Sequence, residues 1–296
     1  MQLPDSFIRT IRTAFEKDGE TFLAALPSLI EEASQRWELS DVQAVPNLSY
    51  NFVAFAKQSN HEVILKLGVP NSEIISEMNT LKLFNGEGTC RLLDCDEEKG
   101  MLLLERLQPG QMLADLQDDA ERTQIAMDVM LKLTRPAPHN GQFLLLADWF
   151  AELKNVRPKF DGGTGPFPPE IFERVEALLP ELFADDDICL MHGDFHHYNI
   201  LSSERGWLVI DPKGVIGPAG YEIGPLMTNP FGILMDRTNF KVQTERRVAI
   251  IHERTNWARE KIINWALAHS VLSAYWDLDL DPNETIEMAK IFSGIK

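Results

Sequence analysis

Apolar side chains recur at helical spacing along the first forty residues, at Phe7, Ile8, Ile11 and Phe15 and again between Phe22 and Ile30. That spacing places them on one face of a helix, so we expect helical structure throughout this segment. Short runs of β-branched and aliphatic residues follow, and such runs are typical of strands. We expect strands over residues 42–45, 51–56, 62–67, 91–95 and 101–105.

A helical pattern separates the third of these runs from the fourth. It begins at Asn71 or Ser72, both good helix N-caps, and continues to Phe84, where Asn85-Gly86 ends it. The pattern therefore predicts an antiparallel sheet flanked by helices, with one long helix between its third and fourth strands.

The sequence pattern changes from mainly strand-like to mainly helical after Pro109-Gly110. We expect helices over residues 111–116, 120–133, 144–156, 169–183 and 248–276. Two short apolar runs, 188–191 and 207–210, are strand candidates, and each is followed by a loop motif. The chain is therefore predicted to be an α+β protein with a small sheet-containing lobe, residues 1–107, and a larger mainly helical lobe, residues 108–296.

Composition places the chain among globular proteins, with 44% hydrophobic and 25% charged residues. Its formal net charge of −17 would repel nucleic-acid phosphates, so we expect no nucleic-acid partner. The same charge would attract a cationic small molecule, although acidity also serves solubility.

The N-terminal residues lack the pattern of a signal peptide, and no apolar run approaches the ~18 residues that span a bilayer. Three scattered cysteines, Cys90, Cys95 and Cys189, are too few for a disulfide framework. We therefore expect a cytoplasmic protein with no membrane partner. The sequence does not indicate an oligomeric state.

The segment richest in candidate chemistry runs from Leu190 to Leu201 and continues at Trp207–Lys213. Asp194 lies five residues before Asn199, and Asp211 lies twelve residues after it. An alternation of strand and loop would bring these three side chains to one site. Phosphoryl transfer needs such a set, because oxygen ligands hold Mg²⁺ and a carboxylate accepts the proton of the attacking hydroxyl.

Two other interpretations of this segment remain open. Asp194 and Asn199 are also residue types that stabilise turns. The cluster of His192, His196 and His197 suggests a transition-metal site, but no cysteine or further histidine at ligand spacing accompanies it.

The motif His192-Gly193-Asp194, with Asn199 and then Ile210-Asp211, resembles the H-G-D-x-x-x-x-N loop and following I-D of the aminoglycoside phosphotransferase family. The longer forms, His192–Leu201 and Asp211–Val215, look like its streptomycin and hydroxyurea phosphotransferase branch. The resemblance implies a two-lobed protein-kinase-like fold that uses ATP and Mg²⁺. It implies Asp194 as the catalytic base, Asn199 and Asp211 as metal ligands, and His192 as an organiser of the loop.

A kinase-like nucleotide lobe also needs a strand lysine that a helix glutamate holds. Lys66 is the candidate lysine, although an edge-strand lysine facing water is the alternative. Glu73 and Glu77 lie one helical turn apart. We prefer Glu77 because the apolar residues that follow it resemble the family's helix, where the glutamate precedes an apolar run. A solvated helix carboxylate is the alternative for either glutamate.

The phosphate-covering turn departs from the protein-kinase pattern, because residues 46–51 contain no glycine. By resemblance to related antibiotic kinases, Ser49 and backbone amides would reach the phosphates. The segment 103–107 resembles the hinge, where main-chain groups of Glu105 and Leu107 would pair with adenine.

Acidic side chains are the candidates for holding the acceptor. Asp277 and Asp279, in the C-terminal region where family members bind acceptor, would contact a guanidinium or amine. Glu222 stands where the family has an acidic residue that stabilises the loop, and we group it with these acceptor candidates. Lys213 either contacts phosphate, balances the acidic cluster or lies free on the surface. The run 185–187 is either a solvated turn or an attractor of cations.

The resemblance therefore implies ATP-dependent O-phosphorylation of a small hydroxylated molecule, with a cationic aminoglycoside such as streptomycin as the favoured acceptor. A metabolic or hydroxyurea-type small-molecule kinase is the first alternative. A non-catalytic nucleotide-binding relative is the second, and only the glycine-free turn favours it.

Overall fold

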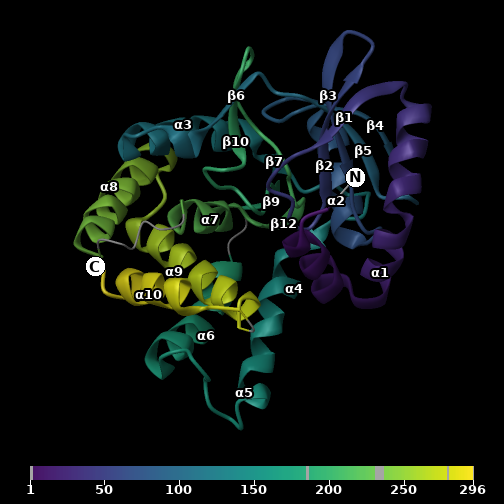
Figure 1. Cartoon of the computed structure of the whole chain (residues 1–296). Coiled ribbons are helices and arrows are strands. Elements are labelled where there is room, and N and C mark those ends of the chain that lie inside the picture. The colour runs from purple at the N-terminus through teal and green to yellow at the C-terminus, as the bar shows by residue number, and fades with distance from the viewer. Residues whose placement is uncertain (1–2, 185–186, 231–236, 279, 296) are drawn as a thin grey trace.

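The computed structural model describes residues 3–184, 187–230, 237–278 and 280–295. Its N-terminal part is a five-stranded antiparallel sheet in the order β1-β2-β3-β5-β4, with one helix on each face (Figure 1). The elements of this part are α1 (Asp5–Arg36), β1 (Leu39–Ala44), β2 (Phe52–Gln58), β3 (His61–Leu67), α2 (Ser72–Phe84), β4 (Leu92–Asp96) and β5 (Met101–Glu105).

Helix α1 is a hairpin of two helical halves rather than one straight rod. Glu16 interrupts it with non-helical backbone angles, φ 47° and ψ −120°. Arg12 and Glu20 form an ion pair at 2.8 Å, although eight residues of straight helix would span about 12 Å. The two halves pack so closely that a Cβ on Gly19 would lie 2.4 Å from the carbonyl oxygen of Ile11. We call this element the α1 hairpin.

The strand period of two residues divides the sheet into two apolar faces. Val63, Leu65 and Leu67 of β3 are buried against the α1 hairpin, whose Phe7 and Ile11 are fully buried there. The alternate residues of β3 face α2, and they include Lys66. Helix α2 begins where the Asn71 side chain accepts a hydrogen bond from the Ile74 amide at 3.0 Å, a typical N-cap.

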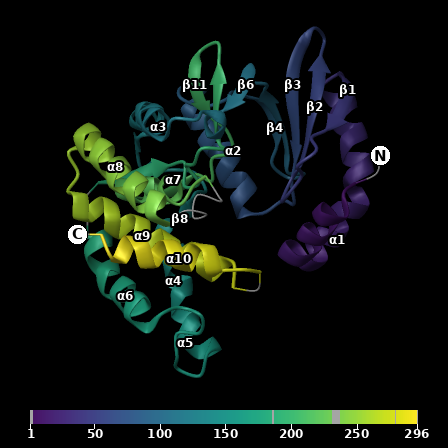
Figure 2. The same cartoon turned by 60° about the vertical axis from the view of Figure 1, so that its left-hand side comes forward.

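The rest of the chain is mainly helical, with two small sheets on the side toward α2 (Figure 2). Its elements are β6 (Pro109–Met112), η1 (Leu113–Asp115), α3 (Asp119–Leu133), β7 (Arg135–Pro136), β8 (Leu144–Leu145), α4 (Leu146–Ala151), η2 (Glu152–Asn155), α5 (Val156–Lys159), α6 (Pro169–Phe183), β9 (Ile188–Met191), β10 (Ile200–Ser203), β11 (Gly206–Val209), β12 (Val215–Pro218), η3 (Ala219–Glu222), α7 (Ile223–Met227), α8 (Arg237–Thr255), α9 (Arg259–Trp276) and α10 (Asn283–Ser293).

Helix α9 is the central element of this part. Residues 262–272 are buried on all sides of the helix, as expected for a helix inside a core. Helices α6, α7, α8 and α10 pack around α9. No helix in the described part of the chain is both long and apolar enough to cross a bilayer.

The fold confirms the predicted α+β architecture and corrects three of the predicted helices. Residues 111–116 form the end of β6 and a short 3₁₀ helix, because β6 pairs with β10. Residues 144–156 divide into β8, α4 and η2. Residues 248–276 belong to two helices, because Asn256, at φ 58°, breaks the chain between α8 and α9. The lobe boundary at residues 107 and 108 stays a prediction.

Candidate active site

A cleft of about 760 Å³ lies between the N-terminal sheet and the helical part. Half of the predicted site residues line it, among them Ser49, Lys66, Glu77, Asp194 and Asp211. Its other lining residues are Ala14, Phe15, Tyr50, Asn51, Val69, Asn71, Glu73, Ile74, Trp149, Glu152, Gly193, His196, Asn199, Pro212, Lys213, His269 and Trp276.

Short strands bring the two acidic loops of the cleft together. Strand β9 ends at Met191, and the loop 192–199 then leads into the hairpin of β10 and β11. The hairpin returns the chain to its start, where the Ile210 amide donates to the Asn199 carbonyl at 2.9 Å. Asp211 therefore follows directly beside Asn199, although twelve residues separate them in sequence.

His192 organises the backbone of the loop 192–199. Its ring is fully buried. Nε2 lies 2.8 Å from the Ile210 carbonyl oxygen, and Nδ1 accepts from the Asp194 amide at 3.2 Å. Burial lowers the pKa of His192 to about 4, so the ring is neutral at physiological pH. A neutral ring with both nitrogens occupied by the backbone holds the loop but is not free to exchange protons with a substrate.

The Asp194 carboxylate projects into the cleft with 39% of its side chain exposed. Burial of the group opposes ionisation, but a hydrogen bond from His196 and the charges of His196 and Lys213 act in the opposite direction, so the pKa of Asp194 lies well below the usual value. His196 Nε2 lies 3.4 Å from Oδ1 of Asp194. Asn199 donates from Nδ2 to the Asp194 carbonyl at 3.0 Å, which leaves the amide oxygen of Asn199 for another ligand.

Lys66 links the sheet, α2 and the loop after β11. Its Nζ lies 2.7 Å from Oε1 of Glu77 and 3.4 Å from Oδ1 of Asp211. Lys66 and Glu77 are almost fully buried, whereas the Asp211 side chain is 46% exposed. Burial would lower the pKa of Lys66, but the charges of Asp211 and Glu77 raise it above its ordinary value. The ammonium group therefore stays charged at this end of the cleft.

Helix α2 is fixed to the loop 211–214 at two further points. Ser76 donates from Oγ to the Gly214 carbonyl at 2.7 Å. Gly214 has φ +69°, and a Cβ there would lie 2.0 Å from Oγ1 of Thr80, so the position requires glycine. Lys213 pairs with Glu73 at 3.1 Å. Glu73 and Glu77 thus hold different lysines, and Glu77 is the partner of Lys66.

Ser49, Glu105 and Leu107, the other predicted nucleotide contacts, receive less support from the structure than Lys66 and Glu77. Ser49 is exposed on the glycine-free turn and lines the cleft. Glu105 donates its backbone N–H to the Arg91 carbonyl at 2.9 Å, and its side chain pairs with Arg205. Its main-chain N–H is therefore not available to an adenine. Leu107 is buried in the cluster under α2.

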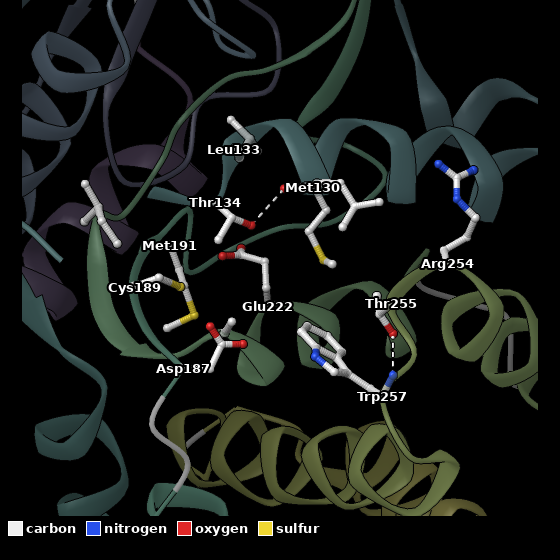
Figure 3. Close-up of a pocket in the computed structure, with 13 residues that line it drawn as sticks. Met130, Leu133, Thr134, Asp187, Cys189, Met191, Glu222, Arg254, Thr255 and Trp257 are labelled. Carbon is white, nitrogen blue, oxygen red and sulfur yellow. Dashed lines mark hydrogen bonds between the residues drawn. The ribbon is translucent and has the colours of Figure 1, made fainter. Parts of the chain in front are cut away.

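Glu222 lies behind the loop 192–199 rather than in the cleft. Its two carboxylate oxygens accept the backbone amides of His192 at 2.9 Å and Gly193 at 3.1 Å. It lines a second cavity of about 300 Å³, where its neighbours include Thr134 and Met191 (Figure 3). Burial raises the pKa of Glu222 to about 8. This placement corrects the prediction that Glu222 contacts the acceptor, because both oxygens are occupied by the loop.

The remaining acceptor candidates receive little support from the structure. Asp279 and residues 185–186 lie outside the described residues. Asp277 ends α9 and is not among the residues that line the cleft, although its neighbour Trp276 is. Sequence reasoning missed Trp149, Glu152 and His269, which line the cleft from the helical part. The available signal was weak, since a single aromatic or histidine in a helix usually belongs to a core.

The donor set of the cleft suits a hard cation such as Mg²⁺. Asn199 and Asp211 offer an amide oxygen and a carboxylate side by side, and Mg²⁺ commonly takes one or two protein ligands and completes its shell with phosphates and water. Within the described residues, no group of three or more histidine, cysteine, aspartate or glutamate side chains is arranged to hold a metal ion.

Comparison with known proteins extends over nearly the whole chain. A streptomycin 6-kinase of Streptomyces glaucescens is 26% identical over 99% of this chain and 98% of its own length. A hydroxyurea phosphotransferase of Kitasatospora aureofaciens is 27% identical over 93% of this chain and 81% of its own length.

Solved structures share the fold. A choline kinase of Streptococcus pneumoniae superposes with a TM-score of 0.64 at 15% identity, over 91% of this chain and 99% of that one. A ternary complex of an aminoglycoside phosphotransferase mutant with ADP and hygromycin B gives 0.60 at 14% identity, over 90% and 97%. The two near-full-length relatives and the family profile together show that the protein is an ATP-dependent phosphotransferase that acts on hydroxyl groups. The sequence profile of aminoglycoside/hydroxyurea antibiotic resistance kinases matches residues 36–280, and the chain belongs to that family.

Proposed function

We propose that this kinase phosphorylates a hydroxyl group of an aminoglycoside, with streptomycin as the favoured acceptor, and that it uses ATP with Mg²⁺. One observation carries the proposal: Lys66, Asp194, Asn199 and Asp211 line a single cleft, and Glu77 holds Lys66 in it. These residue types supply a cation for phosphates, a base for the acceptor hydroxyl and oxygen ligands for a metal.

Asp194 is the proposed base. Its low pKa keeps the carboxylate ionised at neutral pH, so it is ready to orient the acceptor hydroxyl and to take its proton as the phosphate is transferred. His196 and Asn199 fix the carboxylate and the loop around it. His192 and Glu222 act from behind, by holding the backbone of the loop.

Asn199 and Asp211 are the proposed metal ligands, with Oδ1 of Asn199 and the Asp211 carboxylate facing the same cleft. Bound there, Mg²⁺ would neutralise charge on the phosphates during transfer. Lys66 would hold the α- and β-phosphates, and Ser49 would cover them from the glycine-free turn. The carbonyl of Glu105 and the main chain of Leu107 are the proposed adenine contacts.

The choice of acceptor is supported by similarity and by charge. The streptomycin 6-kinase matches this chain from end to end, and a net charge of −17 favours encounter with a cationic antibiotic. Hydroxyurea is the second candidate, because the hydroxyurea phosphotransferase is similarly related. A cytoplasmic location is also part of the proposal, and three free cysteines support it.

The proposal is tested by measuring ADP release from ATP with streptomycin, with hydroxyurea and with no acceptor. We expect streptomycin-dependent turnover that requires Mg²⁺. Asp194→Ala should lower kcat by roughly 10²- to 10⁴-fold while ATP still binds. Turnover with hydroxyurea alone would select the second candidate, and turnover with neither compound would refute both acceptors.

A further inference from the structure

The first half of the α1 hairpin reaches the cleft from the N-terminal side. Ala14 and Phe15, just before the reversal at Glu16, line the cleft. The first, dark purple half of α1 lies at the lower edge of the sheet in Figures 1 and 2. Ile11 and Phe7, about one and two turns earlier, are fully buried in the core of the sheet and anchor this half. The wall is therefore a built part of the fold and not a loose terminus.

Aromatic side chains line the same cleft from three other elements. Trp149 of α4 and Trp276 at the end of α9 meet edge to face, with ring centroids 5.3 Å apart. Trp276 is 44% exposed, and Tyr50 on the glycine-free turn is 51% exposed. Large aromatic surfaces left open inside a cleft are suited to stack on a ring or to face a cation.

A carboxylate accompanies these rings. Glu152 follows α4 directly, lines the cleft and is exposed. Within the part of the chain that the structure describes, its carboxylate has no ion-pair partner. The two lysines of the cleft, Lys66 and Lys213, are held by the glutamates of α2. Positive charge thus lies beside α2, whereas the helical wall offers aromatic faces and a free negative charge.

We propose that Ala14, Phe15, Tyr50, Trp149, Glu152 and Trp276 form the acceptor chamber of this kinase, and that the α1 hairpin is its N-terminal wall. The chamber takes a hydroxylated ring that bears guanidinium or ammonium groups. The ring lies against the aromatic side chains, and its cation pairs with Glu152. This inference rests on the proposed function and deepens it, because it names the residues that select the acceptor.

The first test adds bulk to an exposed alanine of the hairpin. Ala14→Trp should narrow the chamber, and Ala24→Trp is the matched control, since Ala24 is exposed on the same element but does not line the cleft. Equilibrium binding of streptomycin is followed by tryptophan fluorescence, and the KM for ATP by turnover. We expect Ala14→Trp to weaken streptomycin binding at least roughly tenfold and to leave the KM for ATP unchanged. Ala24→Trp should change neither quantity.

The second test removes the negative charge of Glu152. Glu152→Gln should weaken streptomycin binding roughly tenfold and reduce its salt dependence, whereas Glu204→Gln, at an exposed turn away from the cleft, should not. The uncharged polyol myo-inositol serves as a second probe and should bind neither the native protein nor the variants measurably.

Binding separates this inference from the proposed reaction. If the native protein binds streptomycin through these residues but does not phosphorylate it, the proposed reaction is refuted. The proposed acceptor chamber is then still supported. Unchanged streptomycin affinity in both Ala14→Trp and Glu152→Gln would overturn the chamber even if turnover is observed. Absence of streptomycin binding to the native protein, or equal binding of myo-inositol, would overturn the cationic acceptor class.

Discussion

The ammonium group of Lys66 lies 2.7 Å from both carboxylate oxygens of Glu77, in a position that solvent hardly reaches. Removing two charges from water is costly, so such a pair persists only where geometry compensates for the loss of hydration. Here Asp211 provides a further negative charge at 3.4 Å. The pair therefore joins β3 and α2 to the loop that carries a proposed metal ligand.

The two glutamates of α2 offer a matched comparison. Glu77→Gln keeps the side-chain shape but leaves Lys66 with Asp211 alone, so we expect kcat/KM for ATP to fall roughly 100-fold. Glu73→Gln breaks only the half-exposed pair with Lys213 and should cost much less. Steady-state kinetics with ATP as the varied substrate distinguishes them. A larger loss in Glu73→Gln would reverse the assignment.

His196 should set the pH range of catalysis through Asp194. Its charge and hydrogen bond lower the pKa of Asp194, so His196→Ala should raise that pKa. A base works only when deprotonated, and activity falls as pH drops through its pKa. The acidic limb of the kcat profile should therefore move to higher pH in the variant. The exposed His139→Ala serves as control, and an unmoved acidic limb in His196→Ala would contradict the coupling.

The chemical core of the site could be predicted because its residues lie in two short loops close together in sequence. A single hairpin, β10 and β11, is enough to bring Asn199 and Asp211 side by side. Lys66 could also be predicted, since a charged residue in an apolar strand needs a partner. The residues proposed to hold the acceptor could not be predicted in this way. Phe15, Trp149 and Trp276 are far apart in sequence, and each one alone has the pattern of a core aromatic.

Two errors in the predicted elements have different causes. Residues 111 and 112, predicted as the start of a helix, belong to β6 because β10 offers hydrogen-bond partners that the local pattern cannot indicate. Apolar spacing continued across residues 248–276, but the left-handed Asn256 separates α8 from α9 there. Thr255 then accepts from the Trp257 amide at 3.1 Å at the turn. Tertiary pairing decided the first case, and a local turn decided the second.

Lys213 is placed to compensate for the glycine-free turn. Its ammonium group lines the cleft beside Glu73, and its charge lowers the pKa of Asp194. We expect Lys213 to assist phosphate binding, so Lys213→Met should raise the KM for ATP roughly tenfold, and Lys213→Arg should restore most of the affinity. Nucleotide titration measures both. An unchanged KM for ATP in Lys213→Met would assign the lysine to the surface alone.

Glu222 should make the stability of the protein depend on pH. Burial raises its pKa from 4.5 to about 8, although the amides of Gly193 and His192 favour the ionised form. Between these two values the folded protein keeps a proton that the unfolded chain has released. The stability that this bound proton contributes is fully present below the unfolded-state pKa of 4.5. It is lost as pH rises through the folded-state pKa of about 8, by at most about 1.4 kcal/mol per pH unit.

The variant Glu222→Gln cannot titrate, so its free energy of unfolding should lose this dependence. Urea denaturation of the native protein and the variant, at several pH values between about 5 and 9, measures the two slopes. The native protein should lose stability more steeply than the variant as pH rises, while exposed Glu204→Gln should behave like the native protein. Parallel slopes in all three proteins would mean that the amides of His192 and Gly193 keep Glu222 ionised throughout, so that hydrogen bonding to the loop outweighs burial.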